Sequence, residues 1–70
     1  MNSNKLKGMI VLHGDTQEKL AEDMGMATSA LNQRINGRIE FRRNEINFIK
    51  NRYNLSAEEV DAIFFEELVS

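Results

Sequence analysis

The sequence predicts a compact all-helical domain of five short helices, and three observations favour this fold. Proline is absent and β-branched residues are thinly spread, which favours helices over strands. Apolar residues recur three and four positions apart in short segments, which is the spacing of one helix face. The chain has 70 residues, the size of one small domain with a thin core, so residues 1–70 are expected to form a single domain.

The first predicted helix covers residues 3–12. Its apolar face consists of residues three and four positions apart, namely Leu6, Met9 and Ile10. Gly14 suits the left-handed conformation that ends a helix, and His13 lies where a cation favours the helix terminus. Because no second ligand or catalytic partner stands near His13 in the sequence, it is expected to be a local surface residue.

The second predicted helix covers residues 17–24 and ends at Gly25. Either Asp15 or Thr16 can cap its start, and Asp15 with Glu18 has the spacing of a capping box. Its inner stripe is expected to be Leu20, Ala21 and Met24.

The third predicted helix covers residues 28–36, with Asn36-Gly37 as its stop. Its inward residues are spaced four positions apart, namely Leu31 and Ile35. Ala27 stands where a capping Ser or Thr would be favoured. Thr28 is an alternative cap, which would shift the helix start by one residue.

The fourth predicted helix covers residues 43–52 and is extended by Tyr53, until Asn54 breaks it. Its buried residues are expected to be Ile46 and Ile49, and Phe41 can staple onto its start.

A capping box of Ser56 and Glu59 opens the fifth predicted helix. Its inward stripe is expected to be Val60, Ile63, Phe64 and Leu68. Phe65 lies about 100° away from this stripe. It therefore either packs in the core or forms a contact between two copies of the chain.

Charge is divided unevenly along the chain. Residues 1–53 carry nine bases and six acids, a net charge of +3, whereas residues 54–70 carry five acids and no base. Six of the bases fall between Arg34 and Arg52. This asymmetry is typical of a basic working face with an acidic end directed elsewhere, although an ordinary solvated surface with an acidic tail gives the same counts.

The composition disfavours several classes of protein. With no cysteine and one histidine, neither a disulfide nor a zinc site is expected. No apolar run approaches the roughly 20 residues of a membrane span, and the N-terminus is unlike a secretory signal. The sequence lacks paired catalytic groups and a glycine-rich phosphate loop, so no enzyme activity, cofactor or small-molecule ligand is expected. A soluble cytoplasmic protein is the simplest interpretation.

The stretch TQEKLAEDMGMATSALNQRING, residues 16–37, has the features of a helix-turn-helix. Ala21 is small where the second helix would cross closely, Gly25 allows positive φ at the turn, and Met26 is apolar just after it. The stretch resembles the helix-turn-helix of the Cro and phage-repressor (XRE) family. The residues that match in register are Gln17, Leu20-Ala21, Gly25, Leu31 and Asn36-Gly37. Because that family's domain also has five helices, the resemblance extends over nearly the whole chain.

The sequence departs from the family pattern at two places. Many members pair a basic residue on the first helix with a Glu near the end of the third, whereas the matching positions here are Ile10 and Ile35. Replacing a buried ion pair with packed apolar residues is often neutral or stabilising. The second departure is Ala27, where Ser or Thr is common.

The resemblance implies that the third helix enters the major groove of DNA and that its N-terminal side chains meet base edges. Amides and hydroxyls suit this role because base edges present fixed donors and acceptors. The residues expected to contact bases are Thr28, Ser29, Asn32 and Gln33. The alternative is that these four are solvated surface residues.

The resemblance also implies contacts to the phosphate backbone, which fix the register of a protein on DNA. Gln17 is expected at a phosphate near the N-terminus of the second helix, where exposed N–H groups favour anions. The remaining expected contacts are arginines after and within the third helix and at the start of the fourth, namely Arg34, Arg38, Arg42 and Arg43.

The expected function is that of a sequence-specific regulator binding double-stranded operator DNA, Cro-like and phage- or prophage-derived, with a homodimer on DNA as a further partner. The span from Met1 to Ser70 favours a single-domain protein, and a fragment of a two-domain repressor is the alternative. The same fold can also serve as a protein-interaction module of the antirepressor or antitoxin kind. Phe65 and the acidic last helix would carry that second function.

Overall fold

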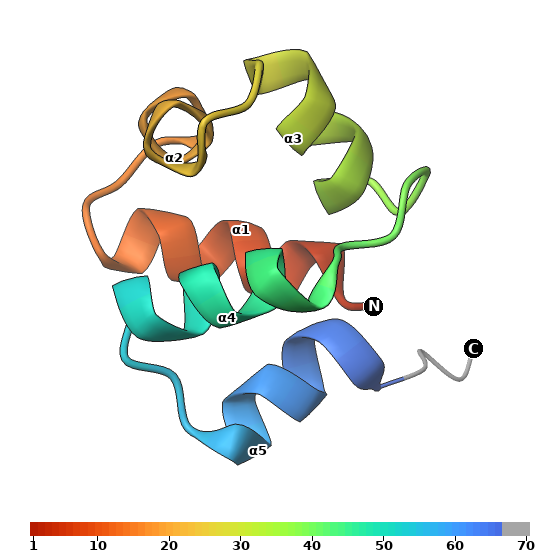
Figure 1. Cartoon of the computed structure of the whole chain (residues 1–70). Helices are drawn as coiled ribbons and strands as arrows, with labels where there is room; N and C mark the ends of the chain where they lie inside the picture. The colour runs from red at the N-terminus through yellow and green to blue at the C-terminus, as the bar shows by residue number, and fades with distance from the viewer. Residues whose placement is uncertain (67–70) are drawn as a thin grey trace.

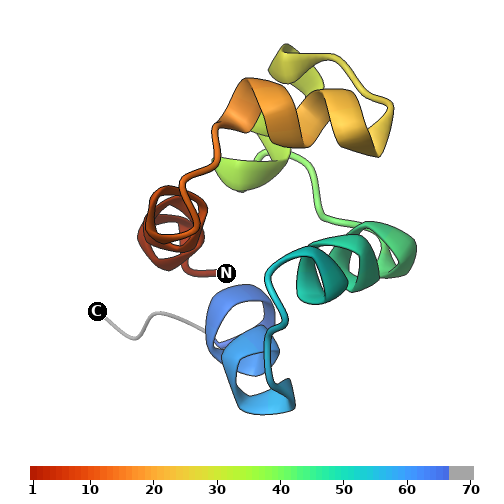
Figure 2. The same ribbon diagram turned by 90° about the vertical axis from the view of Figure 1, so that its left-hand side faces the viewer.

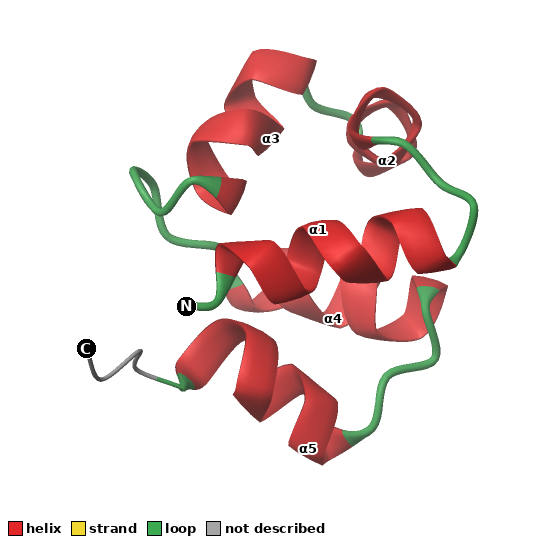
Figure 3. Ribbon diagram, turned by 180° about the vertical axis from the view of Figure 1, so that it is seen from behind, coloured by secondary structure: helices red, strands yellow, loops and turns green. Residues whose placement is uncertain are grey.

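A computed structural model describes residues 1–66, and all regular structure in that range is helical (Figures 1 and 3). These 66 residues form five helices, of which the last continues directly from an α-helical turn into a π-helical segment, η1. Their bounds are α1 Ser3–Leu12, α2 Gln17–Met24, α3 Thr28–Ile35, α4 Arg43–Arg52, α5 Ala57–Val60 and η1 Asp61–Phe65. The predicted all-helical class and the number of helices are confirmed.

The helices surround one core. Helices α1 and α4 lie on opposite sides of it, which is plain in the view along α1 (Figure 2). Helices α2 and α3 cover one end of the core, and the α5–η1 segment covers the other (Figures 1 and 2). This arrangement leaves α2 and α3 together at one end of the molecule.

The core contains most of the apolar residues predicted to face inward. The buried side chains are Leu6, Ile10, Leu20, Ala21, Leu31, Ile35, Ile49, Tyr53, Leu55, Ile63 and Phe64. The predicted inward residues Met9, Met24, Ile46 and Val60 are half-buried against this cluster, whereas Leu68 lies outside the described residues. Ile10 and Ile35 are both buried, so apolar packing occupies the two positions where an ion pair was the alternative.

The start of α2 corrects one prediction. Thr16 is the N-cap, and its Oγ1 accepts from the backbone N–H of Lys19 at 3.0 Å. The predicted capping box of Asp15 and Glu18 is therefore wrong. Asp15 precedes the cap, and its carboxylate accepts hydrogen bonds from Thr16, Arg52 and Tyr53. Gly25 ends α2 with φ +74°, as its left-handed position requires.

The start of α3 corrects another prediction. Ala27 occupies the N-cap position, with no side-chain hydrogen bond to the helix, and Thr28 is the first helical residue. The alternative cap by Thr28 is therefore wrong, and the helix start is not shifted. The helix ends at Ile35, one residue before the predicted end, because Asn36 already has a non-helical conformation.

Helix α4 begins with a polar contact of its own. The backbone N–H of Arg42, at the N-cap position, donates to Glu45 Oε1 at 2.9 Å. Phe41, just before the cap, packs edge-on against Phe64 of η1, with 5.3 Å between ring centroids. Tyr53 terminates the helix instead of extending it, and Asn54 follows with a φ of +52°.

The capping box of Ser56 and Glu59 at the start of α5 is confirmed in both directions. Among residues 1–66, no helix is long and apolar enough to cross a membrane.

Candidate nucleic-acid interface

The outer side of α3 presents uncharged polar groups. Ser29 and Gln33 are exposed, and they lie on the side of the helix away from the buried Leu31 and Ile35. Thr28 and Asn32 flank the core side of this face and are half-buried. Of the four residues predicted to contact bases, Ser29 and Gln33 are thus the most accessible.

Three of the predicted phosphate contacts gather in and just after the connection from α3 to α4. Arg38, Arg42 and Arg43 are all exposed, and each can direct its guanidinium outward. Gln17 is the first residue of α2 and is half-buried. The arginines therefore lie next to α3 along the chain, and Gln17 marks the start of the helix that precedes α3.

The connection is folded back onto the end of α3. Its backbone N–H groups at Arg38 and Ile39 both donate to the carbonyl oxygen of Gln33, at 2.9 and 3.2 Å. Gly37 takes φ +80°, a left-handed conformation that glycine adopts without steric cost. These bonds fix the first arginine of the connection relative to the last turn of α3.

The remaining predicted phosphate contact, Arg34, is placed differently. Its Nε donates to Glu45 Oε1 at 3.0 Å, and its Nη1 donates to the carbonyl oxygen of Ala30 at 3.0 Å. Its side chain is only 14% exposed. Arg34 therefore joins α3 to α4, in contrast to the exposed arginines beside it.

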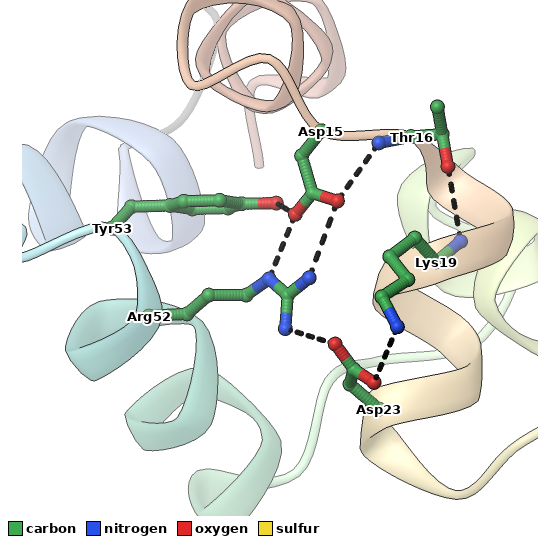
Figure 4. Close-up of polar contacts among 6 residues, drawn as sticks. All are labelled: Asp15, Thr16, Lys19, Asp23, Arg52 and Tyr53. Atoms are coloured by element: carbon green, nitrogen blue, oxygen red, sulfur yellow. Dashed lines mark hydrogen bonds and ion pairs between the residues drawn. The ribbon is translucent and has the colours of Figure 1, made fainter.

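A second polar cluster, not predicted from the sequence, ties α4 to α2 (Figure 4). The guanidinium of Arg52 reaches two carboxylates. Its Nε and Nη2 donate to Asp15 at 2.7 and 3.2 Å, and its Nη1 donates to Asp23 at 2.7 Å. The Tyr53 hydroxyl donates to the same Asp15 carboxylate at 2.7 Å. We call these four residues the Arg52 cluster.

The cluster shifts the acidity of its members. Hydrogen bonds from Arg52 hold the pKa of both Asp15 and Asp23 below the usual value of 3.8. Burial, followed by the hydrogen bond to the Asp15 carboxylate, raises the pKa of Tyr53 above its usual value of 10.0. Both carboxylates are thus ionised and the phenol protonated around neutral pH, which is the state the hydrogen bonds require.

The cluster lies next to the start of α2. Asp15 also accepts from the backbone N–H of Thr16 at 2.9 Å, directly before Gln17. Lys19 adds an ion pair with Asp23 at 3.5 Å along the exposed side of the helix. The N-terminus of α2 is therefore held in place from the end of α4, although α2 and α4 are far apart in sequence.

His13 and Phe65, the other two residues singled out from the sequence, belong to neither α2 nor α3. His13 is exposed, as expected of a surface residue, and its ring stacks on Tyr53, which is distant in the sequence, with 4.8 Å between centroids. Phe65 is 63% exposed, so it is not packed in the core of the described residues. It borders a hollow of about 410 Å³ that is also lined by the apolar side chains of Phe41, Ile46 and Val60 and by Arg43 and Lys50.

No group of three or more His, Asp or Glu side chains within residues 1–66 is arranged to hold a metal ion.

The family described as "Protein of unknown function (DUF739)" matches residues 1–67, so the chain belongs to that family. Neither the curated proteins nor the solved structures contain a match to this chain.

Proposed function

We propose that the chain is a sequence-specific regulator of transcription that binds double-stranded DNA through a helix-turn-helix formed by α2 and α3. The observation that carries this proposal is the surface of α3. Ser29 and Gln33 are exposed on this surface, and α3 contains no acidic residue. Exposed arginines follow in the connection to α4. An uncharged polar surface bordered by cations is suited to a base-pair edge between two phosphate backbones.

In this proposal α3 enters the major groove with its N-terminal residues against the bases. The amide of Gln33 can donate and accept at once, which matches the N6 and N7 groups of adenine. The Ser29 hydroxyl can donate to or accept from a neighbouring base. Thr28 and Asn32 are half-buried at the edges of this surface, so they would contact bases only at its margin. Reading of sequence therefore rests mainly on Gln33 and Ser29.

Phosphates are bound on both sides of α3. Arg38, Arg42 and Arg43 carry exposed charges toward one backbone, and their contacts are independent of base sequence. Gln17, the first residue of α2, would contact a phosphate of the other backbone at the N-terminus of that helix. The protein would act without a cofactor in the cytoplasm, as a Cro-like regulator of the XRE family from a phage or prophage.

A homodimer on DNA is part of this proposal. Two-fold dimers match half-sites about one helical turn apart, which doubles the contacts to one operator. Phe65 supports such a contact because an aromatic side chain that is 63% exposed loses water when a partner covers it. The hollow next to it offers apolar side chains for such a contact, and its charged lining residues are Arg43, Lys50 and Asp61.

The second candidate function is a protein-interaction module, of the antirepressor or antitoxin kind. The same exposed Phe65 favours it, since an apolar residue among acidic neighbours such as Asp61 and Glu66 can equally receive a different protein. In that case the polar surface of α3 is only solvated.

A salt titration separates the two functions. The protein is titrated with mixed-sequence duplexes at salt concentrations between about 50 and 200 mM, the range over which counterion release weakens DNA binding strongly. The regulator is expected to bind at low salt and to lose affinity steeply as salt rises. If no duplex binds at the lowest salt, the regulator proposal fails and the interaction module replaces it.

A further inference from the structure

One carboxylate oxygen joins the end of α3 to the start of α4. Glu45 Oε1 accepts from Arg34 Nε at 3.0 Å and from the backbone N–H of Arg42 at 2.9 Å. The side chains of Arg34 and Glu45 are 14% and 11% exposed, so this ion pair is largely removed from solvent. The pair spans the connection that carries the exposed arginines.

The connection itself is anchored at both ends. At the α3 end, the N–H groups of Arg38 and Ile39 bond to the carbonyl oxygen of Gln33. At the α4 end, the N–H of Arg42 bonds to Glu45, which Arg34 holds against α3. At the α4 end, the ion pair therefore ties Arg42 and Arg43 to α3, whereas Arg38 is held to α3 by its own backbone hydrogen bond to Gln33.

We propose that Arg34, through Glu45, is a positioning residue that sets the exposed Arg42 and Arg43 relative to the base-reading surface of α3, and that it does not itself contact a phosphate. The inference rests on the proposed DNA-binding function and changes the role expected of Arg34 from its sequence alone. Its guanidinium is already bonded to Glu45 and to the carbonyl oxygen of Ala30. A phosphate would have to displace a carboxylate from a pair that is largely shielded from water.

The effects of a positioning residue and of a phosphate contact on binding differ. Removing a phosphate contact weakens binding to all sequences alike and reduces the salt slope by about one unit. Removing a positioning residue leaves the number of phosphate contacts unchanged but misplaces α3 on the bases. The affinity for the preferred sequence then falls by on the order of tenfold, which is within the range for one good base contact. The affinity for other sequences is unchanged.

The test compares two arginines that are four residues apart. Arg34→Met and Arg38→Met remove the same charge with similar volume, one from the ion pair and one from the exposed connection. Each variant is titrated against a duplex that the wild-type protein selects from a randomised pool, and against a scrambled duplex of equal length, at several salt concentrations. Circular dichroism and thermal melting establish that each variant is folded.

Arg38→Met is expected to lower the affinity for both duplexes by the same factor. It should also reduce the slope of log affinity against log salt concentration by about one unit. Arg34→Met is expected to keep the wild-type slope and to lower the ratio of selected to scrambled affinity by about tenfold.

Glu45→Gln provides a second route if Arg34→Met fails to fold. The glutamine oxygen can still accept from the N–H of Arg42, but the charge that holds Arg34 is gone. We expect the same loss of sequence preference at an unchanged salt slope. The double variant should lose no more preference than either single variant, because the two residues act through one contact.

A reduced salt slope for Arg34→Met, with the sequence preference kept, would overturn the inference and make Arg34 a phosphate contact. Additive losses of preference in the double variant would overturn it as well. Both results leave the DNA-binding function standing. If instead the wild-type protein binds neither duplex at low salt, the proposed function has failed, and the positioning role fails with it.

Discussion

At the scale of single residues, Arg52 connects the end of α4 to two carboxylates, those of Asp15 and Asp23. Arg52 lies at the end of α4 and bonds to Asp15, which is 37 positions earlier in the chain. No helical period or local motif connects two residues at that separation, so their pairing could be learned only from the fold. The bond from Arg34 to Glu45 likewise has no local sequence signal, so the sequence alone places Arg34 with the exposed arginines.

Arg52→Met is expected to lower the free energy of unfolding by roughly 1–3 kcal/mol, between the values for exposed and for fully buried ion pairs. The reason is that the Asp15 carboxylate, only 9% exposed, loses its charged partner. Urea unfolding at pH 7 measures the change. Arg43→Met is the matched control at the other end of α4, where the side chain is exposed, and it should change stability by less than about 0.5 kcal/mol. Equal effects of the two variants would show that the Arg52 cluster contributes nothing specific.

At the scale of helices, the sequence predicts most boundaries correctly because the signals are local. The ends of α1, α2 and α4 follow from apolar spacing together with glycine and asparagine stops. The errors lie at capping positions: Asp15 and Thr16 compete for the start of α2, Asn36 lies beyond the end of α3, and Tyr53 caps α4 instead of extending it. The π-helical form of η1 was not predicted, since its apolar stripe resembles that of an ordinary helix.

Helix α3 is the weakest of these elements at its start and relies on its neighbours. It has eight residues and no side-chain cap, while its C-terminal carbonyl at Ile35 accepts from the Ser3 hydroxyl of α1. Short helices without caps gain most of their stability from packing. The α3 surface is therefore defined by the rest of the domain.

Supplying the missing cap should stabilise the domain. Ala27→Ser is expected to raise the free energy of unfolding by about 1 kcal/mol, because a serine hydroxyl at this extended N-cap position can accept from the free N–H groups of the first turn. Ala27→Val is the control, since valine caps as poorly as alanine. Urea unfolding that ranks serine no higher than valine would contradict the assignment of Ala27 as the cap.

At the scale of the whole molecule, a thin apolar core is supplemented by polar contacts between helices. The Arg52 cluster joins α2 to α4, and the Arg34–Glu45 pair joins α3 to α4. Both connect the proposed DNA-binding helices to the same helix, α4. Stability and the geometry of the α3 surface are therefore coupled through α4.

The Arg52 cluster makes the stability of the domain depend on pH, because its two carboxylates must be ionised. The pKa values of Asp15 and Asp23 are lowered on folding, so their contribution is present above about pH 4 and is lost as the pH falls below the usual value of 3.8. Thermal melting between pH 7 and pH 2 should show a decrease in Tm below about pH 4. Asp15→Asn should flatten that decrease, whereas Glu22→Gln, at an exposed position of α2, should not. A decrease of the same size in Asp15→Asn would contradict the role given to Asp15.

The central claim is that the uncharged surface of α3 reads DNA sequence. The most direct measurement is parallel sequencing of duplexes enriched from a randomised pool by wild type, Gln33→Ala and Arg42→Ala. We predict that wild type enriches a defined motif and that Gln33→Ala loses preference at one base pair, at a cost of roughly 1–3 kcal/mol for that site. Arg42→Ala should bind more weakly and enrich the same motif. No enrichment by the wild-type protein, or the same motif at full preference with Gln33→Ala, would contradict the account.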